Sequence, residues 1–120
     1  MKQGIALVAH GSRDPEWSRP FERLTAALEK KLPAVAVALC YLEHGPSLEE
    51  ALAMLVAKGA GSIRVVPVFL GAGGHVKQDL PKLVAAAKHP EVNLVLEKPI
   101  GEQPEVIEAI AAAISGSREP

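Results

Sequence analysis

Cysteine, aromatic residues and long apolar runs are all scarce in this sequence. The single cysteine, Cys40, cannot form an internal disulfide, which indicates a reducing compartment. The apolar run at 5–9 is far too short to span a membrane and lacks the layout of a signal peptide. We therefore expect a soluble cytoplasmic protein with no membrane partner.

Positive charge is not concentrated anywhere either. The 13 Lys and Arg residues are offset by 14 Asp and Glu residues, and no basic block alternates with aromatic residues. This composition argues against nucleic acid as a partner. Only Trp17, Tyr41, Phe21 and Phe69 are aromatic, so the core must be built from aliphatic side chains.

Short apolar runs alternate with segments of helical periodicity. The strands are expected at 5–9, 35–41, 65–70 and 92–96, and the helices at 18–31, from 47 to about 59, at 79–88, and from 104 to just before 116. This alternation predicts one α/β domain over residues 1–120. We expect a single doubly wound, four-stranded parallel sheet in the order 2-1-3-4, with helices on both faces.

The helix ends carry local signals. Asp14-Pro15 predicts a short turn over 15–18 before the first main helix, and Ser47 with Glu50 forms a capping box. Pro81 is expected in the first turn of the third helix, where a missing N–H is harmless. The last helix is expected to face the core with the apolar residues Val106, Ile107, Ile110 and Ile114.

Three groups suited to metal or proton chemistry follow strands. His10 ends the first strand, Glu43 ends the second, and His75 lies just past the third. In the order 2-1-3-4 the winding reverses between strands one and three, and ligands bind at that point of the sheet edge. Imidazole with carboxylate suits cobalt, nickel, iron or zinc and does not suit calcium.

Each residue also has a plainer interpretation. A histidine after a strand is often only a hydrogen-bonded loop residue, and Glu43 alone is typical of an exposed loop carboxylate. The glycine-rich segment 71–74 matches neither GxGxxG nor the P-loop pattern. These glycines are expected to let the loop bend back over the crevice.

Three segments together resemble a known family. They are VAHGSRDP, then Leu42-Glu43 followed by Pro46-Ser47, then PVFLGAGGHVKQDLP, and they occur in this order in the small, single-domain CbiX-type sirohydrochlorin chelatases. The resemblance covers nearly the whole chain. It implies a chelatase-like fold, a homodimer, and insertion of a divalent metal into sirohydrochlorin for cobalamin or another modified tetrapyrrole. The metal would be a substrate, Co²⁺ first and Ni²⁺ or Fe²⁺ as alternatives, with no organic cofactor.

The resemblance also implies roles for particular residues. The two metal-binding histidines of the family fall on His10 and His75, and its site carboxylate falls on Glu43, so these three are the expected catalytic residues. One departure is His44-Gly45, where relatives commonly carry small or apolar residues.

Sirohydrochlorin carries many carboxylates, and a net charge of −1 does not attract it. Local donors must bind it instead: side chains of the two loops and the free amides at helix starts. The expected substrate-binding residues are Ser12, Arg13, Gly73, Gly74, Val76 and Lys77.

Two other functions fit the same residues. A flavodoxin-like module would bind a phosphorylated ligand through the 71–74 loop and Ser12, without metal. A carrier would hold cobalt or nickel through His10 and His75 and pass it on without processing a tetrapyrrole.

Overall fold

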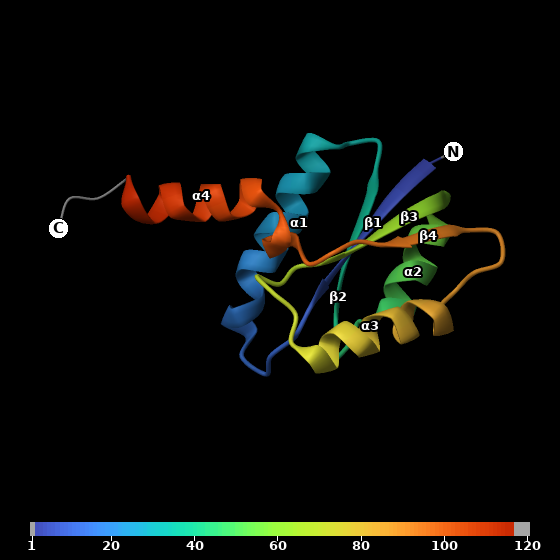
Figure 1. Ribbon diagram of the computed structural model, residues 1–120. Coiled ribbons are helices and arrows are strands. Elements are labelled where there is room, and N and C mark those ends of the chain that lie inside the picture. Colours follow the sequence, from blue (N-terminus) through green and yellow to red (C-terminus); the bar gives the residue numbers. More distant parts are fainter. Residues whose placement is uncertain (1, 117–120) are drawn as a thin grey trace.

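Four parallel strands form the centre of the molecule (Figure 1). The computed structural model describes residues 2–116, apart from the side chain of His75. The strands are β1 (Lys2–Ala9), β2 (Ala36–Tyr41), β3 (Ala60–Pro67) and β4 (Asn93–Leu96), in the order β2-β1-β3-β4. All three neighbouring pairs are parallel. The predicted fold class and strand order are confirmed.

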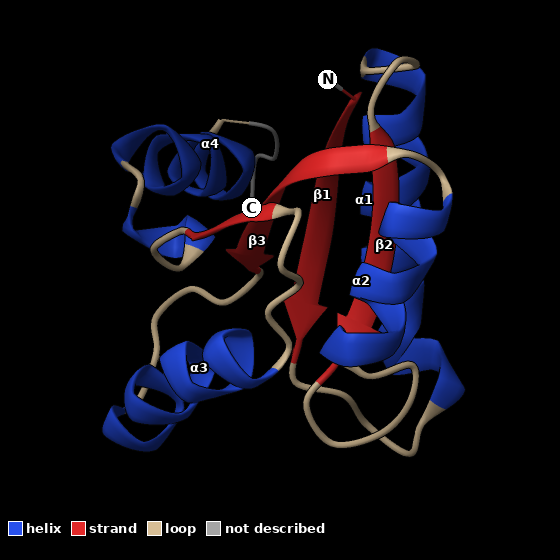
Figure 2. Cartoon of the chain, turned by 90° about the vertical axis from the view of Figure 1, so that its right-hand side faces the viewer, coloured by secondary structure: helices blue, strands red, loops and turns tan. Residues whose placement is uncertain are grey.

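Helices lie on both faces of the sheet, as predicted (Figure 2). One face is covered by α2 (Leu48–Ala57) and α3 (Gly74–Ala86), and the other by α1 (Arg19–Lys31). Two short 3-10 helices, η1 (Pro15–Ser18) and η2 (Ile100–Glu102), precede α1 and α4 (Pro104–Ser115). The predicted turn over 15–18 is therefore confirmed as η1.

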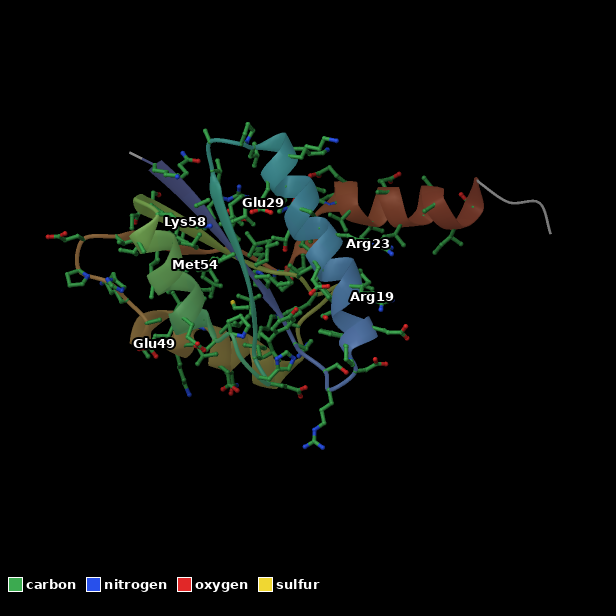
Figure 3. All side chains as sticks on the ribbon, turned by 180° about the vertical axis from the view of Figure 1, so that it is seen from behind. Arg19, Arg23, Glu29, Glu49, Met54 and Lys58 are labelled. Carbon is green, nitrogen blue, oxygen red and sulfur yellow. The ribbon has the colours of Figure 1, made fainter. Side chains whose placement is uncertain are left out.

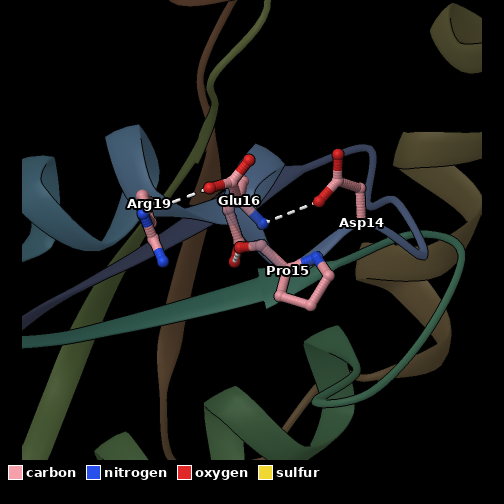
Figure 4. Close-up of polar contacts among 5 residues, drawn as sticks. Asp14, Pro15, Glu16 and Arg19 are labelled. Carbon is pink, nitrogen blue, oxygen red and sulfur yellow. Dashed lines mark hydrogen bonds and ion pairs between the residues drawn. The ribbon is translucent and has the colours of Figure 1, made fainter.

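Side chains cap the starts of η1 and α2. The Glu16 amide donates to Asp14 Oδ1 at 2.9 Å, and Arg19 Nη1 lies 3.5 Å from Glu16 Oε1 (Figure 4). At α2 the predicted capping box forms, because the Glu50 amide donates to Ser47 Oγ and the Ser47 amide donates to Glu50 Oε1. Trp17 in η1 stacks on Phe21, with ring centroids 4.7 Å apart.

The central strand β1 divides the core into two clusters. Ala6 and Val8 point to the face covered by α2 and α3, where the cluster has fourteen buried residues. Ile5 and Leu7 point to the α1 face, where the cluster has four. The first is called the closed face and the second the open face. The imbalance shows that α1 alone does not cover the whole of the open face.

The predicted bounds of the third strand, 65–70, were wrong. The strand begins at Ala60, directly after Gly59, whose φ of +96° turns the chain after α2, and it ends at Pro67, one residue before the Val68 amide makes a last hydrogen bond to the Val8 carbonyl at 2.8 Å. The polar residues Ser62 and Arg64 concealed its first half. Arg64 is exposed because it lies on the open face, where no helix covers this part of the strand.

The predicted start of the third helix, Asp79, was also wrong. Gly73 is the N-cap of α3, and its carbonyl accepts the first intrahelical bond from the Lys77 amide at 3.0 Å. Pro81 therefore lies inside the helix rather than in its first turn. Pro81 has no N–H, so the Lys77 carbonyl lacks its usual hydrogen-bond donor within the helix. Pro81 is on the exposed side of α3, where water can hydrogen-bond a carbonyl and reduce the free-energy cost of the lost bond.

The prediction that α4 faces the core was wrong. None of its residues is buried, and Figures 1 and 3 show it extending away from the sheet. The radius of gyration is 15.1 Å, whereas a compact chain of this length has about 13.6 Å. The physical reason lies in η2, which is anchored before α4 begins.

The anchor of η2 is a close backbone contact. The Gly101 amide donates to the Phe69 carbonyl at 2.9 Å, and a Cβ on Gly101 would overlap the Leu70 backbone. Beside this corner, Arg64 Nε and Nη2 bind both carboxylate oxygens of Glu97 at 2.6 and 3.1 Å. Within residues 2–116, no helix has the length and apolar character needed to cross a membrane.

Candidate functional site

The carboxyl ends of β1 and β2 are joined by backbone hydrogen bonds. The carbonyl of His10, the residue after β1, accepts from the amides of Leu42 at 3.2 Å and Glu43 at 2.9 Å. Parallel pairing therefore continues past both strands and places His10 and Glu43 side by side. Two of the predicted site residues are brought together in this way.

A pocket of about 300 Å³ opens at this edge of the sheet. His10 and Glu43 line it together with residues from α3 and its surroundings: Leu42, Val76, Asp79, Leu80 and Leu83. The predicted substrate-binding residue Val76 is among them. The pocket thus combines an imidazole with two carboxylates on a largely apolar wall.

Asp79 is the residue that the sequence analysis missed. It was expected to start a helix, but the earlier start of α3 places it one turn after His75 on the same side of the helix. The signal was the spacing of four between His75 and Asp79, which becomes informative only once the helix is known to begin at Gly74.

Packing fixes the imidazole of His10. Its ring lies 4.4 Å from the ring of Phe69, centroid to centroid, and Phe69 is 6% exposed. His10 itself is exposed. A buried aromatic ring beneath an exposed imidazole limits the rotamers of the histidine while leaving its nitrogens accessible to a ligand.

His44 shapes the loop that follows β1. Its Nδ1 lies 2.8 Å from the Gly45 carbonyl, which only accepts, so Nδ1 carries the hydrogen and Nε2 accepts from the Ser12 amide at 3.2 Å. Gly11 has φ +103°, and a Cβ there would lie 2.9 Å from His44 Cδ2. His44 is exposed, and its hydrogen bond with the Ser12 amide holds the Ser12 loop in place.

The ring of Tyr41 packs against the imidazole of His44. The two rings lie 4.4 Å apart, and burial raises the pKa of the Tyr41 phenol, against a smaller lowering effect of a hydrogen bond with Ser18. The tyrosine therefore stays neutral through the physiological range and acts as an uncharged wall.

The glycines at 71–74 do not have the role that was expected. In the described residues only Gly11 and Gly59 have positive φ. A Cβ on Gly71, Gly73 or Gly74 would meet nothing within 4 Å. Neither backbone conformation nor packing requires glycine here; the missing side chains leave open space in front of the first amides of α3, which have no intrahelical partner.

The remaining predicted residues surround the pocket. Ser12 and Arg13 lie in the loop after β1, and the Ser12 amide is already engaged by His44. Gly73, Gly74 and Lys77 are exposed at the start of α3. His75 lies in the first turn of α3, but its side chain is outside the described residues. Among the side chains that are described, no group of three His, Cys, Asp or Glu is placed to hold a metal ion.

A larger hollow of about 430 Å³ lies between α3 and β4. Its lining is aliphatic apart from Lys88 and Asn93, with no pair of groups that suits metal or proton chemistry. The smaller pocket beside His10 is therefore the better candidate site.

Comparison with known proteins identifies the family. A family model described as CbiX matches residues 4–117. The chain belongs to the CbiX family. The sirohydrochlorin cobaltochelatase of Saccharolobus islandicus is 31% identical over 121 residues, with 93% of each chain covered.

Two other CbiX-family relatives are much longer. The sirohydrochlorin cobaltochelatase of Priestia megaterium is 32% identical over 98% of this chain, which spans only 39% of that relative. The structure of the sirohydrochlorin chelatase SirB from Bacillus subtilis subspecies spizizenii, solved in complex with cobalt, matches with a TM-score of 0.80 and 31% identity. The match covers 95% of this chain and 50% of SirB.

Proposed function

We propose that this CbiX-family chain is a sirohydrochlorin chelatase that inserts a divalent metal, with Co²⁺ as the first candidate and Ni²⁺ or Fe²⁺ as alternatives. The observation that carries the proposal is the pocket at the carboxyl edge of the sheet, which His10, Glu43 and Asp79 line together. The names of its relatives and the cobalt complex of SirB support it.

His10 and His75 are the proposed metal ligands. His10 stands on a fixed strand end and His75 in the first turn of a helix beside the same pocket. Few protein ligands suit this task, because a substrate metal must be released to the macrocycle rather than held. Neutral imidazoles bind the candidate ions and bring no extra negative charge.

Insertion replaces two pyrrole protons with one divalent ion, so two protons must leave the macrocycle. Glu43 and Asp79 both line the pocket, one after β2 and the other on α3. Each carboxylate can accept one proton, directly or through water. An imidazole that releases its metal becomes a further acceptor.

The macrocycle is larger than the pocket, so we place it across the pocket mouth. Its carboxylates would then extend toward the loop after β1 and the start of α3. Arg13 and Lys77 are exposed there, and the amides of Gly74 and Val76 precede the first intrahelical bond of α3. Cationic side chains and helix N-terminal amides both favour carboxylates.

A homodimer is part of this proposal. The match covers 50% of the SirB chain, so the rest of SirB is long enough for a second unit of the same size. The same holds for the longer Priestia relative, of which 39% is covered. The short Saccharolobus relative is named for the same activity. Two copies of a short chain would supply what the longer chains contain.

The test is an anaerobic metallation assay. Sirohydrochlorin and Co²⁺ are mixed with the protein, and the visible spectrum is followed against a protein-free control. We expect His10→Ala to lose at least about 100-fold in rate, and Glu43→Gln and Asp79→Asn to lose roughly 100-fold each, since general-base removal costs about 10²–10⁴. Arg23→Gln, on the exposed surface of α1, is the matched control and should keep the wild-type rate (Figure 3).

Repeating the assay with Ni²⁺ and Fe²⁺ ranks the metals. A wild-type rate equal to the protein-free rate with all three metals would overturn the chelatase proposal. Tight Co²⁺ binding without turnover would then assign a metal carrier, and binding of a phosphorylated ligand that survives His10→Ala would assign the phosphate module.

A further inference from the structure

Residues 11–14 form the Ser12 loop, which is held by a series of hydrogen bonds that ends on His44. The Ser12 amide donates to His44 Nε2 at 3.2 Å. The Ser12 hydroxyl accepts from the Asp14 amide at 3.1 Å, and Asp14 Oδ1 accepts from the Glu16 amide at 2.9 Å (Figure 4). These bonds connect the chain after β2, through the Ser12 loop, with the start of η1.

Arg13 lies between the two bonded residues Ser12 and Asp14. Its backbone is therefore restrained on both sides, while the residue itself is exposed. Arg13 is one of the cations proposed above to bind the carboxylates of the macrocycle. A side chain that extends from a fixed backbone loses less conformational freedom on binding than one that extends from a loose loop.

The imidazole of His44 is fixed on its other sides. Its Nδ1 lies 2.8 Å from the Gly45 carbonyl, and its ring lies 4.4 Å from the ring of Tyr41 in β2. The backbone of the Ser12 loop approaches the edge of the ring closely, since a Cβ on Gly11 would lie 2.9 Å from His44 Cδ2. His44 thus ties the Ser12 loop to the end of β2.

We propose that His44 is a positioning residue for substrate binding, whose Nε2 holds the Ser12 loop in the conformation from which Arg13 binds a carboxylate of the macrocycle. This deepens the proposed function and rests on it. The role requires the neutral tautomer with the hydrogen on Nδ1, because Nε2 then accepts. The contact of Nδ1 with the Gly45 carbonyl favours that tautomer.

A positioning role predicts a particular kinetic change. His10, Glu43 and Asp79 line the pocket, whereas His44 bonds to the loop beside it. Loss of the His44 hydrogen bond should therefore weaken substrate binding and leave the insertion step unaffected. The change is expected in KM rather than in kcat.

Two substitutions separate the hydrogen bond from the ring. Both His44→Gln and His44→Asn remove the imidazole and its contact with Tyr41. The glutamine oxygen can take the place of Nε2, because both atoms are equally far from Cβ along the side chain, and it can accept from the Ser12 amide. The asparagine side chain ends at the place of Nδ1 and does not reach that amide. His89→Asn, in the exposed loop between α3 and β4, is the matched control.

The first experiment measures binding of sirohydrochlorin through its visible spectrum, without oxygen and without metal. His44→Asn should raise the Kd about 5-fold, the typical effect of one lost hydrogen bond. His44→Gln and His89→Asn should stay within about twofold of the wild type. With Co²⁺ present, the loss in His44→Asn should appear in KM.

A double-mutant cycle asks whether Arg13 is the side chain that His44 positions. Arg13→Gln alone should raise the Kd. In the Arg13→Gln background, His44→Asn should cause little further change, because the side chain to be positioned is already gone. If the two effects multiply instead, His44 does not act through Arg13, and the proposal is overturned.

A further measurement needs no tetrapyrrole. Exchange of the Ser12 amide with water, followed by NMR of the ¹⁵N-labelled chain, should be at least about 5-fold faster in His44→Asn than in the wild type. His44→Gln should restore the slow exchange. Long-range ¹H–¹⁵N spectra of the wild type should place the hydrogen of neutral His44 on Nδ1.

The outcomes separate this inference from the proposed function. A wild type that binds sirohydrochlorin in the His44-dependent way described, but inserts no metal, overturns the chelatase and supports the positioning role. Equal Kd values for wild type and His44→Asn, or a hydrogen on Nε2 of His44, overturn the positioning role whether or not metal is inserted. A wild type that does not bind sirohydrochlorin overturns both.

Discussion

The two faces of the sheet are built from the same strands and differ in how completely they are covered. On the closed face, α2 and α3 bury fourteen residues in one cluster, among them Leu52 and Leu55 at 1% and 0% exposure. On the open face, α1 leaves four buried residues, a groove, and the ion pair of Arg64 with Glu97. A doubly wound sheet is stabilised by apolar cover on both faces, so the comparison shows which face this chain leaves partly uncovered.

The candidate site lies beside the closed face of the sheet. His10 rests on Phe69, which belongs to the closed-face cluster, and α3 brings Asp79 and Leu80 to the pocket from that face. Catalytic groups need fixed neighbours, and the densely packed face supplies them. The open face is less completely covered, with four buried residues in its cluster.

Truncating one leucine on each face should give the largest difference between the two faces. Leu55→Ala on the closed face should lower the free energy of unfolding by about 2–5 kcal/mol, because it opens a cavity among fully buried neighbours. Leu24→Ala on the open face should cost about 1 kcal/mol or less, because that side chain is already 36% in water. Urea unfolding at a protein concentration low enough to dissociate dimers measures both; equal losses would show the faces to be equally packed.

A thiol reagent compares the closed face with the exposed helix α4 without changing the core. Burial raises the pKa of Cys40 to about 12, and Cys40 belongs to the closed-face cluster. Because the thiolate is the reactive form, its labelling at pH 8 should be roughly 1,000-fold slower than that of a free cysteine. An Ile114→Cys variant on α4 should label its new thiol at nearly the free rate under conditions that keep the chain monomeric. Rapid labelling of native Cys40 would contradict a closed face.

Gly101→Ala should release the corner that directs α4. The new Cβ would overlap the Leu70 backbone, and such overpacking typically costs about 1–3 kcal/mol. Gly71→Ala is the matched control, since its Cβ would meet nothing within 4 Å and its φ is not positive. Thermal unfolding of both variants measures the difference. A stability of Gly101→Ala equal to that of Gly71→Ala would show that η2 is not anchored as described.

The smallest effect concerns the ion pair on the open face. The hydrogen bond from Arg64 lowers the pKa of Glu97, so the stabilisation is present above the unfolded pKa of about 4.3 and is lost as the pH falls through the lower, folded value. Because Arg64 is half exposed, we expect about 1 kcal/mol or less. The difference in unfolding free energy between wild type and Glu97→Gln should be present at pH 6, shrink in high salt, and disappear near pH 2. A difference independent of pH would assign it to packing.

Much of the fold could be predicted because β1 is easily recognised in the sequence. Its residues from Gly4 to Ala9 are buried on both faces, so the apolar run stands out in the sequence and fixes the centre of the sheet. The bounds of β3 were predicted less accurately, because Arg64 lies on the open face and interrupts the apolar pattern that a strand buried on both faces would show.

α4 shows what periodicity cannot tell. Its isoleucines correctly predict an amphipathic helix, but the pattern says only that one face is to be covered, and not by which chain. The direction of the helix depends on the contact of Gly101 with Leu70, which joins residues far apart in sequence and leaves no local signal.

The sequence predicts the site residues that follow strands. It does not predict those whose position depends on where a helix begins. His10 and Glu43 follow β1 and β2, so topology alone predicts that they are neighbours. Asp79 and the hydrogen bond between His44 and the Ser12 amide depend on where α3 begins and how a loop folds, which sequence patterns leave open. The assignments of metal and substrate ligands stay predictions.

The aromatic contacts around Trp17 make the molecule its own spectroscopic probe. Trp17 is the only tryptophan, and it lies 4.7 Å from Phe21 and 6.3 Å from Tyr41, whose ring in turn stacks on His44. His44 accepts from the Ser12 amide, so the indole is connected by three contacts to the loop beside the pocket. Intrinsic fluorescence excited at the indole band therefore samples a single place in the chain, and a ligand that rearranges the Ser12 loop should be visible in its emission without any added label.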